Sequence, residues 1–287
     1  MNKHLRYFWG VLIITGFVLP AHAEDDQGWT FSGRFQGSSN SSGLVTKADP
    51  SVGYRFSRHL QTYVGLPVYF VNQASTIQTS STSMNGIGNA YIGFHLGVDN
   101  PAVNFGSNLE ATAPTGDKDK GFSTGRATVD WTNSFSRKFE SVTPFANVGV
   151  ANTVSDTSFF VRPFSSLGLV GHFDGGALFN PAPLVGVGAS AYSVRASGQQ
   201  RIFSKVKKSG ATAAAGNALS SRVDRVFDTN SETVGSAVLA NDHGFSTWLA
   251  VHPGSTVDFQ VGFTRSVGYD LNTLFFGVGF HVGNLNR

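Results

Sequence analysis

The chain has 287 residues, a formal net charge of +3 and no cysteine. The absence of cysteine excludes a disulfide framework, a lipid-modified N-terminal cysteine and thiolate ligands for a metal. Two basic residues, Lys3 and Arg6, belong to the first 23 residues, so the remainder has a net charge of +1, which does not favour nucleic acid as a partner. That remainder has no stretch of 18 apolar residues, which excludes transmembrane helices.

Residues 1–23 predict an export signal. A basic start precedes an apolar run from Tyr7 to Leu19, and Ala21-His22-Ala23 forms a cleavage site with small residues at its first and third positions. The run is too short to cross a bilayer as a helix, so an uncleaved anchor helix is the less favoured alternative. We therefore expect residues 24–287 to be exported into the envelope of a Gram-negative bacterium.

An alternation with a period of two predicts strands along the exported part. Between 274 and 282, large apolar side chains such as Phe276, Val278 and Phe280 alternate with Gly277 and Gly279. The chain contains 34 glycines and 25 phenylalanines, and only 14% of its residues are charged. These features predict an all-β fold, a closed transmembrane antiparallel up-and-down β-barrel whose apolar side faces lipid.

The pattern predicts about twelve strands. In chain order they cover 29–37, 51–56, 62–71, 89–98, 103–113, 126–135, 142–152, 161–173, 183–194, 244–252, 256–267 and 272–283. Ten or fourteen strands are the neighbouring alternatives, and a soluble β-sandwich or lipocalin-like barrel is the alternative fold.

Short and long connections alternate between the predicted strands. Short turns are expected at 57–59, 99–101, 174–176 and 252–255, and longer loops at 73–85, 116–121 and 195–243. An even number of strands returns both ends to the periplasmic side and places the long loops outside. The extracellular loop 195–243 contains an Ala-rich stretch at 211–218, and a lid, a plug and a mobile polar loop all fit its sequence.

Three local patterns resemble a known family. Gly86-Ile87-Gly88-Asn89 opens a strand, Ala113-Pro114-Thr115-Gly116-Asp117 ends the next, and Thr124-Gly125 opens the one after. Together they resemble the outer-membrane proteins of the phenol-degradation meta-pathway. The resemblance is concentrated in 86–150 and implies a β-barrel channel for aromatic compounds.

Two features depart from that family. Asn89 stands where the family usually has aspartate, and the chain ends in Asn284-Leu285-Asn286-Arg287 where many bacterial barrels end in an aromatic residue. Phe280 is the candidate for a displaced assembly signal.

The alternation also assigns individual side chains to the two sides of the wall. We expect the lipid-facing side to include Phe94, Trp131, Phe276, Val278 and Phe280. The opposite side predicts a pore lining that includes Arg34, Arg55, Tyr91, His95, Glu110, Arg126, Asp130, Arg162 and Asp258.

Charged and aromatic residues of this predicted lining suggest two properties of the lumen. Glu110, Arg126 and Asp130 are expected to form a salt-bridge cluster that stabilises the barrel or sets selectivity. Further aromatic and histidine side chains predict a narrow lining suited to small, partly apolar solutes, and these are Phe164, Tyr192, Phe275, His172 and His281.

The predicted function is a channel for passive passage of small, partly hydrophobic solutes, with aromatic compounds as one candidate class. A structural or adhesive barrel that acts through its loops is the alternative, and an outer-membrane lipid hydrolase is a weaker one because the chain has no Gly-x-Ser-x-Gly or His-Glu-x-x-His motif. We expect no enzyme activity, no cofactor and no metal. The expected partners are outer-membrane lipids and lipopolysaccharide, the barrel assembly machinery and a small solute.

Overall fold

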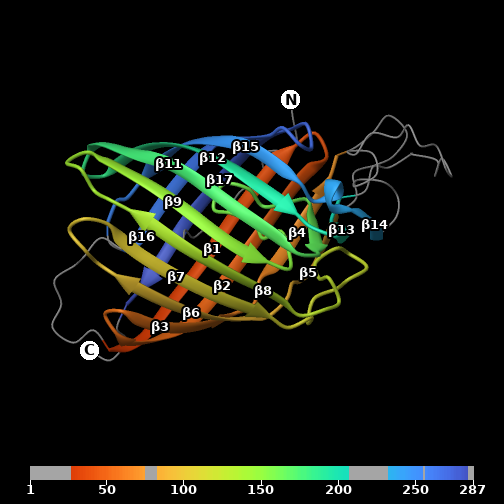
Figure 1. Ribbon diagram of the computed structural model, residues 1–287, viewed down its shortest axis with the longest axis horizontal. Coiled ribbons are helices and arrows are strands. Elements are labelled where there is room, and N and C mark those ends of the chain that lie inside the picture. Colours follow the sequence, from red (N-terminus) through yellow and green to blue (C-terminus); the bar gives the residue numbers. More distant parts are fainter. Residues whose placement is uncertain (1–26, 75–82, 207–231, 255, 284–287) are drawn as a thin grey trace.

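The computed structural model describes residues 27–74, 83–206, 232–254 and 256–283. Its strands are antiparallel neighbours around a closed barrel, in which β1 (Gly28–Asn40) pairs with both β2 (Gly43–Ser57) and β17 (Leu271–Val282) (Figure 1). The expected signal segment 1–23 lies outside the described residues. So does the Ala-rich stretch 211–218.

Two pairs of strand segments each make one position in the wall. β2 pairs with β3 (Leu60–Gly65) near its end and with β4 (Val68–Gln73) near its start, so β3 and β4 run on from one another past Leu66-Pro67. β5 (Ser83–Ile87) and β6 (Tyr91–Val98) form the next position in the same way.

The described residues therefore form twelve wall positions, and the predicted fold class is confirmed. The remaining wall strands are β7 (Asn104–Thr112), β8 (Thr128–Ser136), β9 (Val142–Ala151), β11 (Val170–Ala182), β12 (Val185–Ala196), β15 (Asp242–Val251) and β16 (Val257–Ser266). Three further strands, β10 (Phe164–Leu167), β13 (Gln199–Ser204) and β14 (Glu232–Ser236), form a separate small sheet.

The eighth predicted strand and the turn after it are wrong. The wall strand begins at Val170 instead of 161 and runs straight through Asp174-Gly175-Gly176, and the actual turn is at 183–184. Both neighbouring strands pair with β11 throughout this stretch. A Cβ on Gly176 would lie 2.2 Å from the carbonyl oxygen of Ala189, so here glycine permits close strand contact and does not mark a turn.

The first hairpin is longer than the alternation predicts. β1 and β2 have 13 and 15 residues and are joined only by Ser41 and Ser42. Part of the expected loop 73–85 also belongs to a strand, because β5 begins at Ser83. Polar residues at these strand ends lie at the barrel mouth, where an apolar outer side is not needed.

The outer side of the wall is apolar. Phe94 and Trp131 are half-exposed, and Phe276 and Val278 alternate with the buried Phe275 and Gly277 on β17. Exposed apolar side chains on the outside and polar ones within reverse the pattern of a soluble barrel, as lipid requires. Among the described residues, no helix is long and apolar enough to cross a membrane.

Val278→Arg should impair barrel insertion. Near the middle of the bilayer a lipid-facing arginine costs about 2–4 kcal/mol. The control is Ser134→Arg, because Ser134 alternates with the outward Phe135 and lies beside Gly106, which leaves space for a longer side chain. Refolding yield into lipid vesicles should fall for the first variant and change little for the second; equal yields would contradict the assignment of the two sides.

Candidate functional site in the barrel lumen

The connection between β9 and β11, residues 152–169, folds into the barrel. Its contacts reach strands on different sides of the wall: Ser155 Oγ donates to Asp130 Oδ2 of β8 at 2.7 Å, and the Val161 N–H donates to Ser38 Oγ of β1 at 2.8 Å. Gln260 of β16 donates through Nε2 to the carbonyl oxygen of Ser158 at 2.7 Å. This connection therefore crosses the lumen.

A second connection adds to it. In the small sheet, β13 is the central strand and pairs with β10, from the first connection, on one side and with β14 on the other. Both β13 and β14 belong to the connection between β12 and β15. Figure 1 shows β13 and β14 together with β5 at one end of the barrel. Gln200 and residues 202–206 are almost completely buried, including the apolar Ile202 and Phe203. We call residues 152–169 together with 199–206 the plug.

Part of the predicted loop 195–243 is thus packed into the mouth. Of the three structures that its sequence allowed, residues 199–206 fit a plug. Residues 207–231 lie outside the described ranges.

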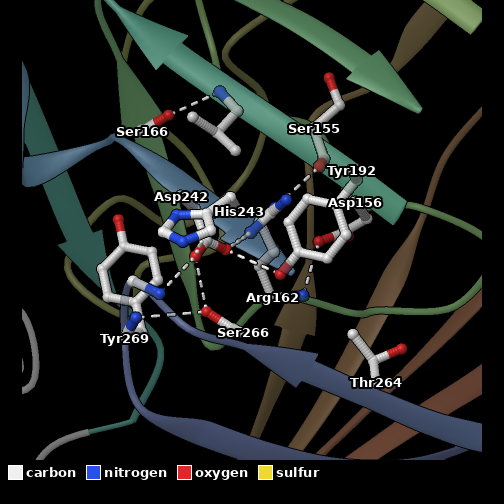
Figure 2. Close-up of polar contacts among 12 residues, drawn as sticks. Ser155, Asp156, Arg162, Ser166, Tyr192, Asp242, His243, Thr264, Ser266 and Tyr269 are labelled. Atoms are coloured by element: carbon white, nitrogen blue, oxygen red, sulfur yellow. Dashed lines mark hydrogen bonds and ion pairs between the residues drawn. The ribbon is translucent and has the colours of Figure 1, made fainter. Parts of the chain in front are cut away.

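A buried ion pair joins the plug to the wall (Figure 2). Arg162 Nη1 lies 3.4 Å from Asp242 Oδ2, and both side chains are almost fully buried. Asp242 also accepts hydrogen bonds from Tyr192 OH at 2.9 Å and Ser266 Oγ at 2.7 Å. The backbone N–H groups of His243 and Gly268 donate to it as well. A charged pair with so many partners holds the plug in one position.

Arg162 therefore does not lie where the sequence places it. The alternation predicts a lumenal residue on a wall strand, but Arg162 belongs to the plug and contacts the wall through Asp242 and the ring of Tyr192. Its backbone N–H donates to Asp156 Oδ1 at 2.9 Å, and its Nε donates to the carbonyl oxygen of Ser155 at 3.1 Å.

Asp156 is the second ionic anchor of the plug. Its carboxylate accepts a hydrogen bond from Tyr69 OH at 3.1 Å, and Nζ atoms lie 3.7 Å away on Lys47 and 3.8 Å away on Lys205. Lys205 Nζ also donates to the carbonyl oxygen of Arg162 at 3.0 Å. Asp156 thus connects both parts of the plug to β2 and β4.

Burial and charge shift the pKa values of these plug residues in a way that affects docking. Burial would raise the pKa of Asp156, but the ammonium groups of Lys205 and Lys47 more than offset it, and the pKa lies below its ordinary value. Burial lowers the pKa of Lys205 to about 8, even though Asp156 acts in the opposite direction. Both groups bind protons less readily in the docked plug than in a solvated loop.

The other predicted lining residues occupy wall positions that alternate with exposed residues, except for one. Tyr91 OH donates to Asp49 Oδ1 at 2.7 Å, and Tyr63 OH donates to Glu110 Oε2 at 3.2 Å. The wall positions are Arg34, Arg55, Tyr91, His95, Glu110, Asp130 and Asp258.

Arg126 is the exception, and the predicted salt-bridge cluster is wrong in this respect. Arg126 precedes β8 in the loop 113–127, is exposed, and takes part in no ion pair within the described part of the chain. Glu110 and Asp130 do lie opposite each other in the register. Their partners are Tyr63 for Glu110, and His172 Nε2 for Asp130 at 3.1 Å.

Ser155, Asp130 and His172 do not form a hydrolase triad. The Ser155 hydroxyl donates to Asp130, and His172 contacts the other oxygen of the same carboxylate. A serine nucleophile needs a histidine next to its hydroxyl, with the acid on the far side of the ring. The described residues also contain no group of three acidic or histidine side chains that could hold a metal.

Sequence reasoning missed several residues of this site. Lys47, Asp156, Lys205 and Asp242 lie in segments that the alternation assigns to loops, and the aromatic Phe159 and Trp248 were not recognised as lumenal. The available signal was a single acidic residue beside a short apolar run, as at Asp156 and Asp242, which could have indicated a buried charged group.

Comparisons with known proteins agree with this architecture. No family model matches the chain, and no curated protein matches it in sequence. Among solved structures, the COG4313 outer-membrane channel from Pseudomonas putida F1 has a TM-score of 0.55 at 10% identity, with 92% of this chain and 99% of that chain covered. The protein has an outer-membrane β-barrel fold.

Two other solved structures are more distant. The NanC porin has a TM-score of 0.47 at 9% identity and covers 87% of this chain and 98% of its own. The Pseudomonas putida toluene transporter TodX has a TM-score of 0.42 at 10% identity, with coverage of 90% and 89%. The likeness to the phenol-degradation family remains a resemblance of short motifs.

Arg162→Ala should release the plug while the barrel persists. Removing one partner of a buried ion pair costs about 3–5 kcal/mol because the other charge is left without compensation. Protease cleavage within 152–169 should become faster, whereas the barrel should still resist heat on gels. The exposed Arg137 supplies a control through Arg137→Ala; equal cleavage rates in the two variants would contradict the anchoring role.

Plug docking should strengthen at alkaline pH. Between about pH 8 and the ordinary lysine value of about 10.4, a solvated loop binds more protons at Lys205 than the docked plug does, so docking becomes more favourable as pH rises. The Asp156 contribution is lost only when the pH falls through its lowered pKa. Cleavage of the plug should slow between about pH 7.5 and 9.5, and Lys205→Met should remove this change while Lys138→Met keeps it.

Proposed function

We propose that the protein is an outer-membrane channel for passive passage of small, partly hydrophobic solutes, with the plug closing its extracellular mouth. The observation that carries this proposal is the plug itself, because two long connections fold into the lumen and are held there by charged groups. A barrel that only anchored surface loops would gain nothing from such an arrangement.

The lumen differs along its length in a way that supports this function. At the mouth that contains the plug, Phe160, Phe164 and Lys205 are almost fully buried. Towards the opposite end, His95 and His281 are exposed. We propose that this end opens to the periplasm, because every connection there is short whereas the long ones lie at the plug end. We also propose that the wall residues Arg34, Arg55, Tyr91, His95, Glu110, Asp130 and Asp258 line the path.

The adhesive alternative is less well supported by the same observation. An adhesin acts through loops that project from the barrel, whereas residues 152–169 and 199–206 point inward. The lipid hydrolase alternative is also less well supported, because Ser155 donates its hydroxyl to Asp130 while His172 contacts the same carboxylate, so this group is not a triad. Lipopolysaccharide and the barrel assembly machinery are proposed partners from the barrel fold alone.

Single-channel recording of refolded protein in planar bilayers tests the proposal. The intact protein should show a small conductance, and replacing residues 155–161 by two glycines should raise it several-fold because the deletion removes the segment that crosses the lumen. Liposome swelling should likewise be faster with the deletion variant than with the intact protein. A folded deletion variant that conducts no better than the intact protein would contradict a channel closed by this plug.

A further inference from the structure

An apolar patch covers one part of the inner wall, away from the ionic anchors. It consists of Phe145 on β9, Leu178 on β11, Trp248 and Ala250 on β15, and Phe275 on β17. These strands are neighbours once β12 and β16 are included, so the patch extends across six consecutive wall strands. We call these five residues the aromatic patch.

Glycines on the intervening strands let the rings lie flat against the wall. Gly188 of β12 is directly opposite Trp248, and a Cβ there would lie 2.1 Å from the indole ring. Gly262 of β16 is directly opposite Phe275, and a Cβ there would lie 2.5 Å from that ring. Each ring therefore covers a glycine with one face. The other face points into the lumen, where another ring can stack on it.

The plug places one of its own rings on this patch. Phe159 stacks on Trp248 with a centroid distance of 4.1 Å and an interplanar angle of 24°, and it lies 5.5 Å from Phe275. Phe159 is at the tip of a tight turn in which Thr157 and Phe160 pair through their backbones. It is only half-buried, so the aromatic patch holds it on one side only.

Two wall residues fix the tip through the backbone. Gln260 Nε2 donates to the carbonyl oxygen of Ser158 at 2.7 Å, and Thr264 Oγ1 donates to that of Phe159 at 2.8 Å. Both donors belong to β16 and lie on either side of Gly262. If the tip moved away, the patch would present an open stacking face next to two hydrogen-bond donors.

We propose that the aromatic patch is a binding site for an uncharged aromatic solute with a hydrogen-bond-accepting substituent, and that Phe159 occupies this site as a built-in competitor. The solute ring stacks on Trp248, and its substituent accepts from Gln260 or Thr264. This inference rests on the proposed channel function, since the solute reaches the patch through the lumen.

Trp248 itself reports on the site. Trp29 and Trp131 are half-exposed on the outer side, so replacing both with Phe leaves Trp248 as the only tryptophan in refolded residues 24–287. Benzyl alcohol is the probe, and cyclohexylmethanol is the matched probe that lacks an aromatic ring. Titration is followed by the change in tryptophan emission.

In this background Phe159→Ala should bind benzyl alcohol more tightly by about five-fold, the order expected when one competing aromatic pair is lost. Cyclohexylmethanol should bind more weakly than benzyl alcohol. Phe179→Ala, at an exposed outer position on β11, is the control and should leave the affinity unchanged. Phe159→Leu provides the same test with less change in volume if the alanine variant does not fold.

Equal affinity of the Phe159 variants and the parent, or equal binding of the two probes, would overturn the proposed site. Benzyl alcohol flux into liposomes separates this result from a failure of the channel proposal. Tighter binding in the Phe159 variants without flux would leave the site standing and remove the channel. Flux with unchanged binding would leave the channel standing and remove the site.

Discussion

A ring of twelve strands encloses more space than the side chains of its own wall can fill. Lipid outside the barrel demands apolar residues there, so the same alternation sends polar and charged residues into that space. The protein meets this constraint by folding two connections into the mouth. The plug, the ionic anchors and the aromatic patch all depend on the width that twelve strands impose.

Filling a lumen with backbone creates a second requirement, because buried N–H and C=O groups need partners. Wall side chains supply them: Ser38, Gln260 and Thr264 each bond to a backbone group of the plug. Apolar contact adds to this, since Phe160 and Phe164 pack in a buried cluster with Leu271 and Tyr269. The plug is thus a small folded core that uses the barrel as its outer layer.

The sequence predicts the wall well and the lumen poorly, for a physical reason. A period of two records which side of a strand meets lipid, and this is why the twelve wall positions could be predicted. A plug segment has no periodic contact with lipid. Residues 161–169 appeared to extend a strand because several of them are apolar, but Val161 and Phe164 pack inside the mouth.

The same reasoning explains the individual errors at the site. Arg162 was assigned by parity on a strand that does not include it, and Arg126 was placed on β8, which begins two residues later. The partners Asp156 and Asp242 are separated by 86 residues in sequence, so no local pattern could show that both contact Arg162. Only the closed barrel brings them together.

Thiol labelling of the plug on intact cells tests the central claim most directly, because the chain contains no native cysteine. Val161→Cys places a thiol at a plug position that is 2% exposed and packs in a buried cluster with Val45 and Val71 of the wall, and Ser197→Cys places one at an exposed position of the same mouth. A membrane-impermeant maleimide should label Cys at 197 rapidly and Cys at 161 at least about ten-fold more slowly, as expected for a site that opens only by a local transition. Equally rapid labelling of both would show that the plug does not occupy the lumen.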